Sequence, residues 1–152
     1  MFVSIIQTES DLIVNVLTTV LRLALGLVIL PHGLQKLLGW FGGYGYRGTM
    51  GYFTQTLHIP YVFGLLAIVA ESFGALAVIA GLLTRPAALA IGVVMAVAAL
   101  MVHRRYGFFG NWFGNQAGEG VEYFILAAAI ALALVVTGGG AWSLDYLLTN
   151  WS

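Results

Sequence analysis

Two ionisable residues lie within hydrophobic stretches, where a charge is costly. Glu71 lies in the middle of segment 61–83, and Arg22 lies within segment 12–38. A charge near the centre of a bilayer costs at least about 2.5 kcal/mol, so such residues normally face protein and mark function. The residues at helical spacing from Glu71 are small, which favours close packing of that face against other helices. Glu71 is therefore a candidate for binding a ligand or carrying a proton.

The depths of Arg22 and Glu71 suggest that they are partners. Arg22 lies about ten residues from the outer end of its segment, and Glu71 lies about eleven or twelve residues from the same side of the next one. The two opposite charges would then be nearly level. Because buried charges usually pair, the sequence predicts an Arg22–Glu71 ion pair. That pairing is compatible with a further role for Glu71.

A second group of polar residues is expected near the opposite ends of these segments. His32 and Lys36 are four residues apart, so they share one face of a helix. His103 closes the third apolar segment and Glu122 opens the fourth, and small residues share their helix faces. The sequence predicts that these four side chains line one pocket near the membrane surface.

Several ligands could suit such a pocket. Two histidines and a glutamate could bind a metal, and a histidine pair could bind haem. The sequence shows no metal-ligand spacing motif, so no metal is expected. The preferred ligand is a quinone, because imidazole and ammonium groups can donate hydrogen bonds to its carbonyl oxygens. The alternative is a set of unrelated interfacial groups: Lys36 can extend to the surface, Glu122 suits a helix start, and His103 suits a helix end.

The elements that must position these residues follow from composition. The 152-residue chain is 61% hydrophobic and only 8% charged, with six basic and six acidic residues, whereas soluble domains are about 25% charged. The sequence predicts an all-α integral membrane protein, a four-helix bundle forming a single domain over residues 1–152. With no net charge and no cysteine, nucleic-acid binding and thiol chemistry are excluded. The helices are expected at about 12–38, 61–83, 86–103 and 119–137.

The two long connections, 39–60 and 104–118, indicate how the bundle meets the membrane surface. In the first, Met50, Phe53 and Leu57 lie at helical spacing, on the side opposite Thr49, Gln55 and Thr56. This pattern predicts a short interfacial helix between the first two membrane helices. Lys36, Arg47, Arg104 and Arg105 lie in or beside these connections, whereas Arg85 lies at the other end of the bundle. The positive-inside rule then predicts that both connections face the cytoplasm. The protein itself is expected in the inner membrane of the cell.

Five sequence pieces, in order, resemble the DoxX family of small four-helix bacterial membrane proteins. They are RLALGLVILPHGLQKLLGWFGG, ESFGALAVIAGLLTRPAALAI, MAVAALMVHRRYGFFGNW, GEGVEYFIL and GGGAWSLD. The positions carried over from the family pattern are Arg22, His32, Gly33, Lys36, Glu71, Gly81, Arg85, His103, Glu122 and Asp145. The family often has Gly-Pro-Gly before the final Ser-Leu-Asp, whereas this chain has three glycines at 138–140.

The resemblance implies quinone-linked redox work, since the family is named for a membrane subunit of an archaeal thiosulfate:quinone oxidoreductase. The expectation is an accessory subunit that is not catalytic on its own, surrounded by lipid and bound to other membrane subunits or to further copies of itself. One alternative is a small transporter or channel with a polar path through Arg22, Glu71 and His103. Another is a purely structural subunit of a larger membrane assembly.

Overall fold

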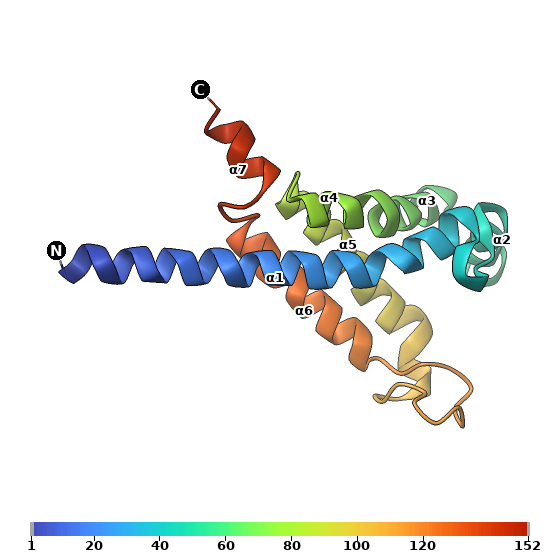
Figure 1. Ribbon diagram of the computed structural model, residues 1–152. Helices are drawn as coiled ribbons and strands as arrows, with labels where there is room; N and C mark the ends of the chain where they lie inside the picture. The colour runs from blue at the N-terminus through green and yellow to red at the C-terminus, as the bar shows by residue number, and fades with distance from the viewer. Residues whose placement is uncertain (1, 152) are drawn as a thin grey trace.

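The computed structural model describes residues 2–151, with side chains from Glu9 to Trp151, so both ends of the predicted domain 1–152 lie outside the described residues. This part of the chain consists of helices and the loops that connect them, without strands. In chain order the elements are α1 (Phe2–Leu38), η1 (Trp40–Gly42), α2 (Gly45–Gly51), η2 (Tyr52–Thr56), α3 (Tyr61–Val69), η3 (Ala70–Gly74), α4 (Ala75–Ala80), α5 (Thr84–Ala98), η4 (Ala99–His103), η5 (Arg104–Tyr106), α6 (Glu122–Thr137) and α7 (Leu144–Thr149) (Figure 1).

The predicted four-helix membrane bundle is confirmed. Three helical stretches within the described residues are long and apolar enough to cross a bilayer: Glu9–Leu38, Tyr61–Ala80 and Thr84–Tyr106. The fourth helix, α6, is shorter, with 16 residues. Large apolar side chains are exposed along the outer faces of these helices. Such a surface suits lipid, and it would be unstable in water.

Helix α1 begins well before the predicted start at residue 12. It has 37 residues, so it is about 55 Å long, and its N-terminal half extends past the other helices (Figure 1). It ends where Gly39 adopts a left-handed conformation with φ of 77°, as glycines after a helix commonly do. Because of this extension, the N-terminal end of α1 is not level with the hairpin between α4 and α5 (Figure 1).

Two glycines set the register between α1 and the continuous helix Tyr61–Ala80. A Cβ atom on Gly33 would lie 2.6 Å from the Ser72 nitrogen, and one on Gly26 would lie 2.9 Å from the Ala75 carbonyl oxygen. Real side chains do not approach so closely, so the two helices pack backbone to backbone. This contact places Gly33 beside Glu71 and Ser72.

The apolar core lies between α1, α4, α5 and α6, where α5 and α6 pack along each other. Its fully buried members are Leu25, Ile29, Ala75, Val78, Ala88, Ile91, Met95, Ala127, Ala131 and Leu134. Figure 1 shows α5 and α6 running obliquely to α1, so that their far ends diverge from α2 and α3. This divergence leaves one side of the bundle open.

The predicted interfacial helix forms as α2 and η2 and packs against the bundle. Met50 is buried, and both Met50 and Phe53 contact Gly64 of α3. The prediction that Thr49 lies on the polar, exposed side of this helix is wrong, because Thr49 is only 6% exposed. The helix folds back on α1 as well as on α3, so part of its second face is covered by protein.

Candidate functional site

A large cleft opens where α5 and α6 diverge from α2 and α3. It has a volume of about 2240 Å³ and is lined by α1, α2, α3, α4, α5, α6 and the connection before α6. Ligand pockets commonly measure about 300–1,000 Å³, so this one could hold a ligand much larger than a single ring. We call it the lateral cleft. His32, Lys36, His103 and Glu122 all line it, as do Glu71 and Tyr123.

Lys36 and Glu71 form a salt bridge in the lateral cleft. The Glu71 side chain is 4% exposed and that of Lys36 is 27% exposed. The neighbouring Gly33 lets α1 approach the Glu71 backbone, so the Lys36 side chain reaches along α1 to the carboxylate. Glu71 lies on η3, a π-helical turn, and such turns often occur at functional sites.

The predicted Arg22–Glu71 ion pair is therefore wrong. The Arg22 guanidinium lies against Gly81 and donates a hydrogen bond of 2.6 Å to the Trp142 carbonyl oxygen. The glycine contact at Gly33 sets Glu71 about 16 Å further along α1 than Arg22. The predicted pairing assumed that segments 12–38 and 61–83 end at the same level on this side of the membrane, whereas α1 extends past the α4–α5 hairpin.

His32, which is exposed, and Tyr123, which is half-buried, lie together in the lateral cleft. Their ring centroids are 5.8 Å apart. The Tyr123 hydroxyl is buried and has no hydrogen-bond partner among the described residues. Sequence reasoning missed Tyr123, although it directly follows Glu122, because one tyrosine at a helix start has no distinctive spacing. We call His32, Lys36, Glu71 and Tyr123 the polar cluster.

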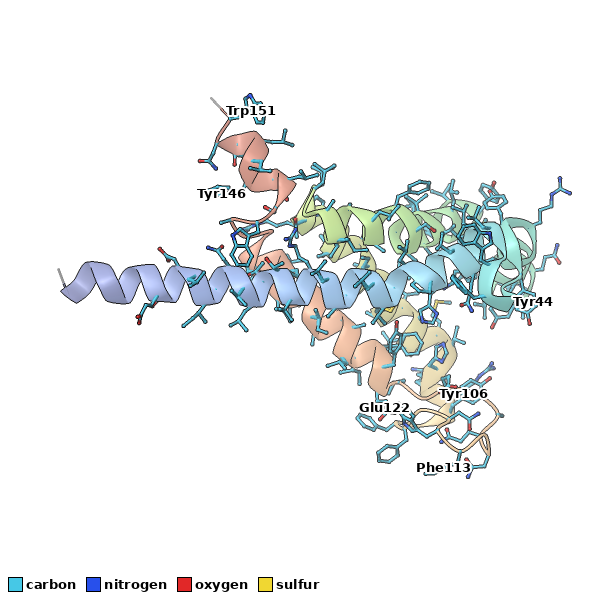
Figure 2. All side chains as sticks on the ribbon, in the orientation of Figure 1. Tyr44, Tyr106, Phe113, Glu122, Tyr146 and Trp151 are labelled. Atoms are coloured by element: carbon cyan, nitrogen blue, oxygen red, sulfur yellow. The ribbon has the colours of Figure 1, made fainter. Side chains whose placement is uncertain are left out.

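The other two predicted site residues hold the connection 107–121, which we call the aromatic loop. Glu122 accepts hydrogen bonds of 2.7 Å from both the Gly110 nitrogen and the Trp112 indole. The His103 ring stacks on Phe124 at 4.0 Å, and its Nδ1 lies 2.9 Å from the Glu119 carbonyl oxygen. Figure 2 shows Glu122, Tyr106 and Phe113 gathered at this end of α5 and α6.

The four predicted residues therefore line one cleft but form two groups. His32 and Lys36 belong to the polar cluster, whereas His103 and Glu122 anchor the aromatic loop. Among the described residues, no three histidine, aspartate or glutamate side chains are placed to hold a metal ion. The cleft combines an ammonium group, a carboxylate, an imidazole and a phenol with mostly apolar walls.

A second polar site joins the C-terminal segment to the opposite end of the bundle. The Asp145 carboxylate accepts hydrogen bonds from the Leu83 and Thr84 nitrogens, at 2.7 and 2.9 Å. Burial raises the pKa of Asp145, but hydrogen bonds from the Thr84 and Leu83 backbone and the charge of Arg22 outweigh it, so the pKa lies below its usual value. This site fastens α7 to the α4–α5 hairpin.

Comparison with known proteins agrees with the membrane-spanning helical fold. The DoxX family model matches residues 17–104. The inner membrane protein YphA of Escherichia coli strain K12 is 28% identical over 130 residues, which cover 86% of this chain and 89% of that protein. No solved structure matches the chain. With its several apolar helices, the protein is a multi-pass inner membrane protein. It belongs to the DoxX family.

Proposed function

We propose that this protein is an accessory membrane subunit that binds the head group of a quinone in the lateral cleft and serves a quinone-linked oxidoreductase. The observation that carries the proposal is the polar cluster, which lies in a cleft of the bundle with mostly apolar walls. Ligand sites typically combine apolar walls with a few convergent polar groups. The polar cluster has this character.

The chemistry of the polar cluster suits a ring with two carbonyl oxygens. The Lys36 ammonium has three donor hydrogens, so it can donate to a carbonyl oxygen while its salt bridge to Glu71 is kept. The Tyr123 hydroxyl has no protein partner among the described residues, so it is a free donor. Glu71 balances the Lys36 charge, which would otherwise be costly in a low-dielectric site. His32 adds a flat face beside Tyr123.

The aromatic loop has a positioning role in this proposal. Glu122 and His103 fix the loop through its backbone and through Trp112. The loop then covers the membrane-surface end of the cleft, where Gly110, Asn111 and Trp112 line it. Loss of either anchor should loosen the loop and weaken ligand binding indirectly. Neither residue needs to contact the quinone.

The alternative of a polar transport path has less support. Arg22 is separated from the polar cluster by Leu25, Ile29 and Val78, which are buried apolar residues of the core. A path from Arg22 through Glu71 to His103 would have to cross this packing. Solute or proton flux in liposomes that stops in a Glu71→Gln variant would favour the transporter. A purely structural subunit would instead co-purify with one partner and bind no quinone.

The proposal is tested by quinone binding to protein purified in mild detergent. The probe is a substituted benzoquinone with two isoprenoid units, and the readout is saturable quenching of tryptophan fluorescence. The double variant Lys36→Met/Glu71→Gln removes both charges of the salt bridge and keeps similar side-chain volumes. We expect its affinity to fall about tenfold or more, which corresponds to loss of one charge-assisted hydrogen bond.

The matched control for this test is Arg47→Gln. Arg47 is exposed on α2 and does not line the lateral cleft. Its substitution removes one charge from the same end of the bundle and should leave the affinity unchanged. Equal affinities in the wild type and the double variant would contradict the proposal. Mass spectrometry of quinones and proteins that co-purify from native membranes would identify the ligand and the partner subunit.

A further inference from the structure

The lateral cleft is much longer than a quinone ring. On the Thr84–Tyr106 stretch its lining continues from Pro86 to His103, a distance of about 26 Å along the helix. The polar cluster occupies only a part of this length. Towards the α4–α5 hairpin the lining is apolar and includes Ala77, Leu83 and Ala87. The cleft therefore has a polar part and a long apolar extension.

The floor of the apolar extension consists of small residues. Ala70, Gly74 and Ala77 line it from one helix, and Ala87 and Ala90 line it from α5. A Cβ atom on Gly74 would lie 3.9 Å from the Ala87 carbonyl oxygen, so the two helices meet at the bottom of the groove. Small side chains on facing helices leave room above the contact for a narrow, flexible chain.

The rims of the apolar extension face the bilayer. Phe73 is 57% exposed and Val93 is 53% exposed, and both line the cleft. A chain in this groove would rest on protein on one side and touch the lipid hydrocarbon on the other. A molecule dissolved in the membrane can enter such a groove sideways without crossing water.

We propose that the apolar extension holds the isoprenoid chain of the quinone, so that the ligand is a long-tailed lipid quinone that enters from within the bilayer. This inference rests on the proposed function, because the polar cluster fixes the head group and thereby the direction of the tail. A water-soluble quinone would fill the polar part alone and leave most of the 2240 Å³ cleft unused. An amphipathic molecule with one polar end matches both parts.

The test compares the same benzoquinone ring with no chain and with two isoprenoid units. Ala90→Leu fills the groove, and because Ala90 is exposed, the larger side chain does not enter the packed core. The matched control is Ala96→Leu, an exposed position on the same helix that does not line the cleft. Binding is measured in detergent by tryptophan quenching, as for the head group.

In the wild type and in Ala96→Leu, we expect the chain to raise the affinity by about tenfold or more. In Ala90→Leu the chain should bring little gain, while the bare ring should bind as in the wild type. Equal affinities for both ligands in the wild type would contradict the proposal that the apolar extension holds the isoprenoid chain, and would leave the proposed head-group site unaffected. Displacement of the tailed quinone by phospholipid at equal concentration would assign the groove to ordinary lipid. Absence of binding by either ligand would overturn the proposed function together with this inference.

Discussion

Lys36 reaches Glu71 because a glycine one turn earlier on α1 removes the side chain that would separate the two helices. A Cβ at Gly33 would collide with the Glu71–Ser72 backbone. Four predicted site residues line the lateral cleft, since residue type and position at helix ends indicate polar groups near a membrane surface. Their partners could not be predicted, because pairing depends on the register between helices.

The Lys36–Glu71 salt bridge predicts that the two residues depend on each other. Lys36→Met leaves a nearly fully buried carboxylate without its partner and should lower the free energy of unfolding by up to about 3 kcal/mol. The double variant Lys36→Met/Glu71→Gln should recover most of this loss. Thermal stability in detergent, followed by size-exclusion chromatography, measures both effects. A double variant as unstable as the sum of the two single variants would show that no direct interaction exists.

At the opposite end of the bundle, Asp145 predicts a dependence on pH. Because its pKa in the folded protein is lowered, its stabilising effect is present above the usual value of 3.8 and is lost as the pH falls through the lowered value. The α7 segment should therefore loosen in acid. Asp145→Asn keeps only one acceptor oxygen, so it loses one of the two hydrogen bonds and should loosen α7 at neutral pH as well, by about 1 kcal/mol.

Hydrogen exchange of residues 144–149, corrected for the intrinsic rate at each pH, measures this loosening. The Asp145→Asn variant should show fast exchange at all pH values, whereas the wild type should become fast only in acid. Glu9→Gln is a suitable control, because Glu9 is exposed on α1 and does not line the cavity beside α7. Exchange that is equally slow in the wild type and in Asp145→Asn would contradict the role of this carboxylate.

At the scale of elements, hydropathy predicted where the helices lie but not how they are staggered. The predicted segments 61–83 and 86–103 differ from the observed Tyr61–Ala80 and Thr84–Tyr106 by three residues or fewer at each end. Helix α1 is the exception, because its first ten residues are helical without being strongly apolar. The π-helical turns η2, η3 and η4, each of which contributes to the cleft lining, have no sequence signal that could have been used.

The close approach of α1 predicts an unequal response to two Gly→Ala substitutions. Gly33→Ala places a Cβ against backbone atoms that cannot rotate away, so it should lower the free energy of unfolding by about 2 kcal/mol or more. Gly51→Ala, on α2, has no neighbouring atom within 4 Å and should be neutral or stabilising by up to about 1 kcal/mol. Thermal stability measured on the two variants side by side tests the predicted difference. Equal stability of the two variants would contradict the register between α1 and Glu71.

At the scale of the whole molecule, the two long connections lie at one end of the bundle, and the N-terminus and α7 lie towards the other (Figure 1). The cations near the long connections predict that this end faces the cytoplasm. The single cysteine variants Gln55→Cys and Asn115→Cys should resist an impermeant thiol reagent in intact cells. Asn150→Cys should react. All three positions are exposed in a cysteine-free chain, so the reverse pattern would invert the orientation.

The occupancy of the lateral cleft can be measured directly with a photoreactive quinone. An isoprenoid benzoquinone with an azido group on the ring is irradiated with the purified protein, and labelled peptides are located by mass spectrometry. We predict saturable labelling within 61–80 and 119–126, the segments that carry Glu71 and Tyr123, and its loss when unlabelled quinone is in excess. Labelling confined to the outer face of α1, or labelling that excess quinone does not reduce, would contradict binding in the cleft.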